Sequence, residues 1–276
     1  MLRSWVVAVG FVLGLVLAPT AARAEVPWLG ITYDDSGSAL GARVLEVHEG
    51  SAASACGLRA GDLVLGIDQV PVNPGSGALG QVIRSRQAGD RVVLDVLRAG
   101  ALISVTTTLT VKPSDDELLH NRLVGRRAPG WLLQRADDGR WIDDRALRGR
   151  VGVLVFFELG CAECVAALDD LGQWARRQPA SALTLFAVAG AELPVGRAFL
   201  GRTPLLVSLL LDPTRRPGGL GDVIRQFVIS PGGMTVVVTD PRGVVRHAAL
   251  LDAAELSERD ALDDVTAAAA RAMRRR

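Results

Sequence analysis

No segment of the chain restricts the possible folds more than residues 151–157, which read Val-Gly-Val-Leu-Val-Phe-Phe. An apolar run without polar alternation is expected of a β-strand buried on both faces, inside a sheet that carries helices on both sides. From about residue 122 onward, strand-like and helix-like segments alternate along the chain. This order is typical of an α/β domain.

The segments around this run predict the rest of that domain. A helix is expected over 162–177, because Val165, Leu168, Leu171 and Trp174 fall on one helical face. Trp131 and Trp141 are assigned to a hairpin that precedes the buried strand. The remaining expected elements are strands at 182–188, 205–211, 235–239 and 244–247, a short helix at 221–227, and a closing helix at 252–273.

Residues 25–111 have a different pattern, with short runs rich in Val, Leu, Ile and Thr between Gly-rich turns. Such runs predict strands, and we expect a mainly β domain here. The polar stretch at 112–117 interrupts the pattern, so we predict a linker over 112–121 and a second domain over 122–276. The expected elements of the first domain are strands at 42–47, 62–67, 91–97 and 102–109 and helices at 51–56 and 78–86.

The first 24 residues have the pattern of a secretory signal peptide. Arg3 precedes an apolar stretch over 5–18, and Ala22-Arg23-Ala24 forms a small-x-small end. We therefore predict export to the periplasm with cleavage after Ala24. An N-terminal membrane anchor is the alternative, although the apolar stretch is near the short end of the roughly 17–25 residues that a span needs.

Composition excludes several classes of function. The 276 residues include 49% hydrophobic and 22% charged residues, which is a globular balance, and the net charge is +1. This charge does not favour a nucleic acid as partner. Three cysteines are too few for a disulfide-built scaffold or a four-thiolate zinc site.

Two of the cysteines form the motif Cys161-Ala162-Glu163-Cys164. It falls where the buried strand ends and the predicted helix begins, so unpaired N–H groups and the helix dipole favour a thiolate at Cys161. We predict that Cys161 is the attacking sulfur and Cys164 the resolving one. Glu163 opposes a second negative charge nearby, which favours a reductant over an oxidant. The alternatives are a permanent structural disulfide and a Cu(I) site, and Cys56 is interpreted as a buried core thiol.

Several segments resemble the TlpA-type thioredoxin-like proteins. They are Leu123 to Trp131, Leu147 to Val151 and Phe156-Phe157 followed by the cysteine pair, and the likeness runs from about 122 to 274. The resemblance implies a thioredoxin-like α/β fold and a periplasmic or membrane-attached protein that exchanges disulfides with partner proteins, often during cytochrome c maturation. Carried over, Cys161 attacks, Cys164 resolves, and the redox-active disulfide serves in place of any other cofactor.

The sequence departs from that family around the expected substrate groove. Gly160 replaces the usual tryptophan before the first cysteine, and Ala167 replaces a glutamate of the following helix. The family's cis-proline position falls on Met234. The groove residues expected from this resemblance are Gly160, Glu163, Pro231, Gly233 and Met234.

Residues 26–110 are similar to bacterial PDZ domains. The motifs are Trp28-Leu29-Gly30-Ile31 and the stretch from Gly50 to Asp62, which is continued by 66–72. The resemblance implies that Leu29, Gly30 and Ile31 bind the carboxylate of a peptide C-terminus. It also implies that the peptide adds as a strand beside Ile31 to Tyr33, against the helix near Ala78 to Ile83. Gly30 would leave room for the close approach of a carboxylate.

Together these observations favour an exported thiol-disulfide oxidoreductase with a PDZ-like module for recruiting partners. Its expected partners are proteins with disulfides or dithiols, C-terminal peptides, and a membrane or periplasmic electron donor. Two other hypotheses stay open, a non-catalytic PDZ adaptor with a structural disulfide and a Cu(I)-binding redox chaperone.

Overall fold

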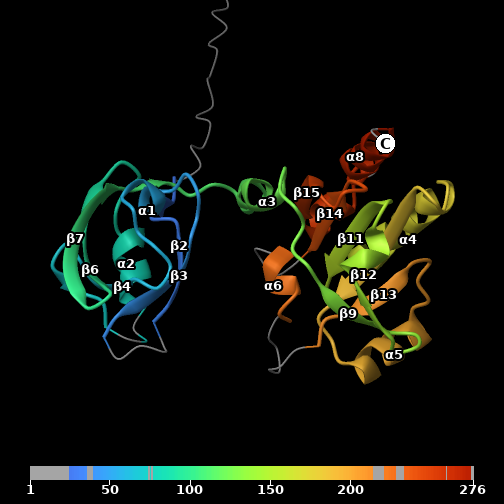
Figure 1. The fold of residues 1–276 in the computed structure, drawn as a ribbon, viewed down its shortest axis with the longest axis horizontal. Helices are drawn as coiled ribbons and strands as arrows, with labels where there is room; N and C mark the ends of the chain where they lie inside the picture. Colours follow the sequence, from blue (N-terminus) through green and yellow to red (C-terminus); the bar gives the residue numbers. More distant parts are fainter. Residues whose placement is uncertain are drawn as a thin grey trace, which may run out of the picture. The chain divides into compact units, whose positions relative to one another are not determined.

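The computed structural model describes residues 25–35, 40–73, 75, 77–213, 221–227, 233–258 and 260–274. The chain divides into two compact units, Met1–Lys112 and Pro113–Arg276, which Figure 1 colours from blue to green and from green to red. The predicted signal peptide at 1–24 and the groove residue Pro231 lie outside the described residues.

The N-terminal unit is built on an antiparallel sheet in the order β2-β3-β4-β6-β7, with β5 added by pairing to β4. A separate pair joins β1 to β8, and two short helices, α1 and α2, accompany the sheet (Figure 1). The elements are β1 (Pro27–Trp28), β2 (Ile31–Asp34), β3 (Ala42–Val47), α1 (Ala52–Ala55), β4 (Leu63–Ile67), β5 (Val70–Pro71), α2 (Ala78–Arg84), β6 (Arg91–Arg98), β7 (Ala101–Thr108) and β8 (Thr110–Val111).

The core of this unit follows from alternation along its strands. On β6, Val92, Leu94 and Val96 are fully buried, and the positions between them are more exposed. Because successive side chains of a strand point to opposite faces, one face of the sheet packs inward while the other faces solvent. Leu79 and Ile83 of α2 join the inward side chains in a single cluster.

The C-terminal unit contains a seven-stranded mixed sheet in the order β10-β9-β13-β12-β11-β14-β15. Strands β11, β12 and β13 run parallel to one another, and β14, β15 and β9 are antiparallel to their neighbours. The strands are β9 (Leu132–Arg135), β10 (Trp141–Asp143), β11 (Val151–Phe157), β12 (Leu183–Ala189), β13 (Ser208–Leu211), β14 (Met234–Thr239) and β15 (Val245–Leu251).

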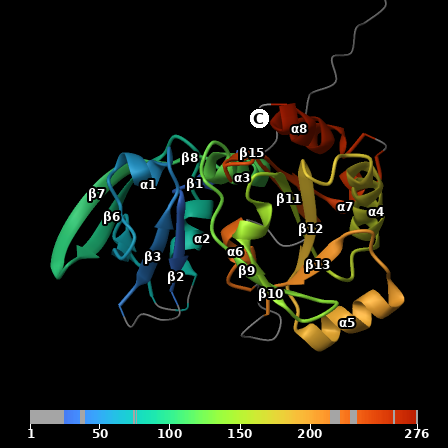
Figure 2. The ribbon, with the colours of Figure 1, turned by 45° about the vertical axis from the view of Figure 1, so that its right-hand side comes forward.

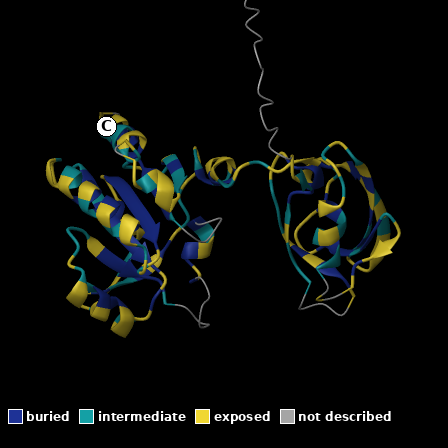
Figure 3. Cartoon of the chain, turned by 180° about the vertical axis from the view of Figure 1, so that it is seen from behind, coloured by how far each residue is buried: buried dark blue, intermediate teal, exposed yellow. Residues whose placement is uncertain are grey.

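Helices cover both faces of this sheet. Figure 2 shows α3 and α6 on one side of it and α4 and α7 on the other, and Figure 3 shows buried strands between helices whose outer faces are exposed. The helical elements are α3 (Asp115–Leu123), the 3-10 turn η1 (Asp144–Leu147), α4 (Ala162–Arg176), α5 (Leu193–Arg202), α6 (Ile224–Phe227), α7 (Ala253–Leu256) and α8 (Asp263–Arg274).

The central strand β11 is buried at all seven positions. Val153 and Val155 belong to the core cluster that contains residues of α4 and α8, and Leu154 and Phe156 belong to the opposite cluster with α3 and α6. The structure confirms the expected fold class. A mainly β region is followed by an α/β region whose central strand is buried on both faces.

Helix α3 occupies most of the range in which we expected a linker. Ser114 and Glu117 cap each other, since the Glu117 N–H donates to the Ser114 hydroxyl and the Ser114 N–H donates to the Glu117 carboxylate. Leu119 and Leu123 are buried in the core of the C-terminal unit. The polar composition of 112–117 therefore marks the start of a helix and not an extended linker.

The prediction of one continuous helix over 252–273 is wrong, because the chain forms two helices, α7 and α8, with a break between them. Asp252 and Glu255 cap the start of α7. The Ser257 hydroxyl donates to the Ala253 carbonyl at 3.0 Å, a bond by which serine competes with helix continuation. Leu256 packs against the core cluster around α4, and α8 begins afresh at Asp263.

Candidate active site

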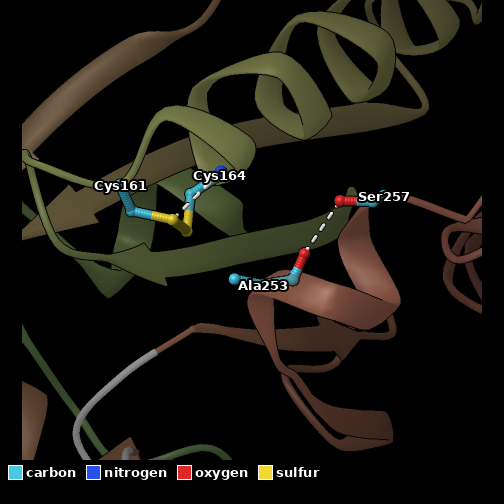
Figure 4. Close-up of a disulfide and its surroundings, with 4 residues drawn as sticks. All are labelled: Cys161, Cys164, Ala253 and Ser257. Atoms are coloured by element: carbon cyan, nitrogen blue, oxygen red, sulfur yellow. Dashed lines mark hydrogen bonds between the residues drawn. A yellow bond between two sulfur atoms is a disulfide. The ribbon is translucent and has the colours of Figure 1, made fainter.

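The cysteine pair lies where β11 gives way to α4. After Phe157 a short turn, in which the Cys161 N–H donates to the Glu158 carbonyl at 3.0 Å, brings the chain to the helix start. Cys161 is the N-cap of α4, and its sulfur accepts a hydrogen bond from the Cys164 N–H at 3.1 Å. The two residues form a disulfide with a Cα–Cα distance of 5.2 Å (Figure 4).

The two sulfurs differ in burial. Cys164 has no exposed surface and belongs to the core cluster with Phe157 and Leu168. Cys161 is half-buried and only packs against that cluster. A partner can therefore reach Cys161, while Cys164 is shielded beneath it.

Backbone geometry favours negative charge at Cys161. Helix α4 is 15 residues long and begins immediately after this residue, so the N–H groups of its first turn and the helix dipole are directed toward the Cys161 sulfur. The same groups would stabilise a thiolate after reduction. The buried positions of α4 are Cys164, Ala167, Leu168, Leu171 and Gly172, so this helix places no acidic side chain under the pair.

The expected groove residues are placed in different environments. Gly160 and Glu163 are exposed on either side of Cys161, and Gly233 is half-buried. Met234 is fully buried: it lies opposite Phe157 in the register of β11 and β14, on the core face shared with Val236. The expectation that Met234 lines an accessible groove is corrected, because its side chain is part of the core.

Gly233 has a specific backbone role beside the pair. Its φ is +78°, and a Cβ at this position would lie 2.3 Å from the Leu251 carbonyl oxygen. No side chain larger than hydrogen fits there without movement of β15. Leu251 leads directly into Asp252 and α7, which lies next to the disulfide in Figure 4.

Sequence reasoning missed α7 as a neighbour of the disulfide. Its signal was present as Asp252-Ala253-Ala254-Glu255, since an acidic N-cap followed three residues later by Glu is a capping pattern. Helix α7 packs against α4, so it forms part of the surroundings of Cys161.

Asp212 was also missed. It follows β13, at the same carboxyl-terminal edge of the parallel strands as the cysteine pair, and is 4% exposed. Burial raises the pKa of this carboxyl, although its hydrogen bonds from the Val223 and Ile224 N–H groups oppose that change. These bonds hold the start of α6, whose Phe227 stacks on Phe156. Asp212 is thus a structural group at the edge where the disulfide lies.

In the N-terminal unit, Leu29 and Gly30 are buried and Ile31 is half-buried at the start of β2. Gly30 has a φ of +84°, and a Cβ there would lie 2.0 Å from the Ser51 Cβ. Its carbonyl accepts from the His48 N–H at 3.0 Å and the Ser51 hydroxyl at 3.3 Å. Contact with Ser51, which precedes α1, is therefore sufficient by itself to require glycine.

Among the described strands, β2 pairs only with β3, so one edge of β2 is left for another strand. The Tyr33 side chain extends from β2 to α2. Its hydroxyl lies so near Gly80 of α2 that a Cβ on this glycine would be 2.8 Å from it. A peptide added to β2 would meet this side chain two residues after Ile31.

Within the described part of the chain, no group of three or more His, Cys, Asp and Glu side chains could hold a metal ion. The helices described there are too short or too polar to cross a membrane.

The arrangement of the C-terminal unit defines its class. Three parallel strands with β14 and β15 antiparallel beside them, and a Cys-x-x-Cys pair at the start of the helix after β11, constitute a thioredoxin-like fold. The N-terminal unit is a mainly β PDZ-like domain, and a family model described as PDZ domain matches residues 27–109.

Comparison with solved structures finds several similar proteins. A thiol-disulfide isomerase from Corynebacterium glutamicum is 13% identical, with 53% of this chain and 95% of that chain covered and a TM-score of 0.42. The thioredoxin domain of a thiol-disulfide oxidoreductase from Bacteroides vulgatus is 16% identical, with 52% and 95% covered and a TM-score of 0.42. The HtrA-type protease AlgW with a decapeptide is 28% identical, with 32% and 30% covered and a TM-score of 0.29. Among curated proteins, no sequence matches the chain.

Proposed function

We propose that this chain is an exported protein-disulfide oxidoreductase of the TlpA type that acts through Cys161 and Cys164. The observation that carries the proposal is the difference between the two sulfurs, one half-exposed at a helix start and the other fully buried three residues later. This difference in exposure suits the two steps of disulfide exchange. The attacking sulfur must be accessible to the substrate disulfide, whereas the resolving sulfur needs to reach only the attacking sulfur.

The reaction transfers two electrons. The Cys161 thiolate attacks one sulfur of a substrate disulfide, which forms a mixed disulfide and releases the other substrate sulfur as a thiolate that takes up a proton. The Cys164 thiolate then attacks the Cys161 sulfur, releases the second substrate thiol, and leaves the Cys161–Cys164 disulfide. A membrane or periplasmic dithiol donor restores the reduced pair. Exposed Glu163 in the first turn of α4 disfavours the thiolate, which supports a reductase direction.

The same proposal places the protein in the periplasm, on the basis of the signal-peptide pattern at 1–24. It assigns the PDZ-like unit to recruitment, with the C-terminal peptide of a partner added to β2 near Leu29, Gly30 and Ile31. The unoccupied edge of β2 among the described strands supports this assignment.

Trapping tests the oxidoreductase. In a Cys164→Ser chain the mixed disulfide on Cys161 cannot resolve, so partner proteins should accumulate as adducts that a reductant releases. Cys161→Ser should trap none, and Cys56→Ser, which leaves the pair intact, should turn over insulin disulfides at the rate of the unaltered protein. A chain that traps nothing and has no insulin-reducing activity would overturn the proposal.

Two readouts distinguish the alternatives. A reduction potential below about −300 mV without turnover would indicate a structural disulfide, and hence an adaptor. Cu(I) titration that saturates with one ion and is lost in Cys161→Ser would indicate a copper carrier. The recruiting role is tested with a C-terminal peptide library, for which binding should be lost when the terminal carboxylate of a bound peptide is amidated. Equal binding of the free and the amidated peptide would contradict this role.

A further inference from the structure

A cavity of about 380 Å³ lies at the edge of the C-terminal sheet opposite the disulfide. Its walls come from the chain around 127–131, 144–148 and 239–243. Residue 148 shortly precedes β11 and Thr239 ends the antiparallel β14, so both lie at the edge where β11 begins. The seven residues of β11 put roughly 20 Å between this edge and the cysteine pair, at about 3.3 Å per residue.

Part of the cavity wall is apolar. Trp131 and Leu147 are 4% and 7% exposed and face it together with Pro129 and Pro241. Its volume is within the usual range of about 300–1,000 Å³ for small-molecule pockets, which are mostly apolar with a few polar groups that fix orientation.

The rim is positively charged. Arg127, Arg148 and Arg242 line the cavity and are exposed, and Asp144 is the one acidic residue among the lining positions. In the described part of the chain these three guanidinium groups form no ion pair. The neighbouring carboxylate of Asp240 is already paired with Arg246. The cavity is therefore lined by three positive charges and one negative charge, beside walls that are partly apolar.

Backbone hydrogen bonds hold the three wall segments in place. The Asp144 N–H donates to the Trp131 carbonyl at 3.2 Å, the Gly149 N–H to the Pro241 carbonyl at 3.1 Å, and the Ala128 N–H to the Gly243 carbonyl at 2.9 Å. The Asp240 carboxylate accepts from the Arg242 N–H at 2.9 Å and so fixes the turn that carries Arg242. The cavity is preformed, which lowers the cost of ordering it around a ligand.

We propose that this cavity binds a small organic dianion, of which a phosphate monoester with an apolar substituent is the simplest case. The apolar part would lie against Trp131 and Leu147. Guanidinium groups bind phosphate and carboxylate oxygens through paired N–H donors, so Arg127, Arg148 and Arg242 would hold the charged end. Three arginines against one aspartate give the lining a net charge of +2, which matches a ligand of charge −2.

Calorimetric titration of the full chain in its oxidised form tests this site, with phenyl phosphate and inorganic phosphate as probes. Phenyl phosphate should bind, and inorganic phosphate should bind more weakly because it makes no contact with the apolar part of the wall at Trp131 and Leu147. The double variant Arg148→Gln/Arg242→Gln should weaken binding of phenyl phosphate by about ten-fold or more. Arg176→Gln, an exposed arginine at the end of α4, should leave it unchanged.

The proposal is overturned if phenyl phosphate does not bind at millimolar concentration. It is also overturned if the double variant binds phenyl phosphate as tightly as the unaltered protein and Arg176→Gln do. Equal affinity for the two probes would overturn the organic part of the assignment. Should the double variant fail to fold by circular dichroism, arginine modification by phenylglyoxal in the unaltered protein replaces it. Phenyl phosphate should then slow modification of Arg148 and Arg242 but not of Arg176, and uniform modification would overturn the site.

Discussion

In the C-terminal unit the cysteine pair follows a strand whose seven residues are all buried, whereas in the N-terminal unit the candidate peptide edge belongs to the outermost strand of its sheet. Cys161 and Cys164 are three residues apart and are placed by one helix start. The edge at β2 depends on residues far apart in sequence, since Gly30 contacts Ser51 and Tyr33 reaches Gly80. The first site is thus a local arrangement on a rigid support, and the second is a product of tertiary packing.

The largest expected effect tests the local site. Cys161→Ser should reduce insulin-disulfide reduction to the uncatalysed background, because it removes the half-exposed sulfur of the pair and leaves only the fully buried one. Cys56→Ser is the matched control, since Cys56 is the free cysteine of the N-terminal unit. Residual activity well above background in Cys161→Ser would show that the exposed sulfur is not the nucleophile.

The second effect tests the packed site. Gly30 and Gly100 share a φ of +84°, but a Cβ on Gly100 would have no atom within 4 Å, whereas one on Gly30 would lie 2.0 Å from the Ser51 Cβ. Gly100→Ala should cost about 1 kcal/mol of stability from the left-handed backbone alone. Gly30→Ala should cost at least about 3 kcal/mol, because Ser51 is 1% exposed and cannot move away.

Hydrogen exchange of peptides from β3 and β6, followed by mass spectrometry of the full chain, gives the free energy of opening of this unit for both variants. Equal losses in Gly30→Ala and Gly100→Ala would contradict the contact with Ser51 as the reason for glycine.

A third test compares buried acids of the two units, beginning with Asp62. A hydrogen bond from Arg98 holds the pKa of Asp62 below its ordinary value of 3.8, and the carboxylate pairs with that guanidinium at 2.6 Å. Because the pKa of Asp62 is lower in the folded than in the unfolded state, its ionised carboxylate stabilises the fold at pH values above 3.8. This stabilisation is lost as the pH falls through the pKa of the folded state. Asp62→Asn should therefore cost about 2 kcal/mol at pH 7 and progressively less below about pH 4. Urea unfolding of both chains over this pH range measures it, and a cost independent of pH would contradict the ion pair.

The smallest expected effect concerns Asp212 of the C-terminal unit. Burial raises the pKa of Asp212, so keeping this carboxyl ionised in the folded state costs stability. That cost is fully present at pH values above the pKa of the folded state. Asp212→Asn keeps an oxygen to accept from the Val223 and Ile224 N–H groups and removes the buried charge. It should raise stability by up to about 1 kcal/mol at pH 7, with the gain vanishing at acidic pH. A loss of stability at pH 7 would show that the charge itself holds α6.

These differences explain what the sequence could predict. Strands 42–47 and 151–157 and the helix that begins after Cys161 agree with the structure to within a residue, because alternation, continuous burial and a helix start are all local patterns. The resemblance to PDZ domains also places Tyr33 and the helix at 78–83 around one peptide site. The packing of Gly30 against Ser51 could not be predicted, since neither residue type nor spacing indicates which distant groups lie together.

The same limit applies around the disulfide. The resemblance places Met234 in a groove, yet the register of β14 against β11 turns its side chain into the core. The sequence predicts one long helix where α7 and α8 form, and a linker where α3 begins. These predictions fail because the residue types that cap helices also occur in linkers.

The central claim is that one sulfur of the pair meets partners and the other does not. A short pulse of iodoacetamide on the fully reduced chain at pH 7, with the modified sites read by mass spectrometry, measures this directly. Cys161, half-buried at the start of α4, should be alkylated at least about ten-fold faster than Cys164, which has no exposed surface. Equal rates at the two cysteines, or no reaction at either, would contradict the account.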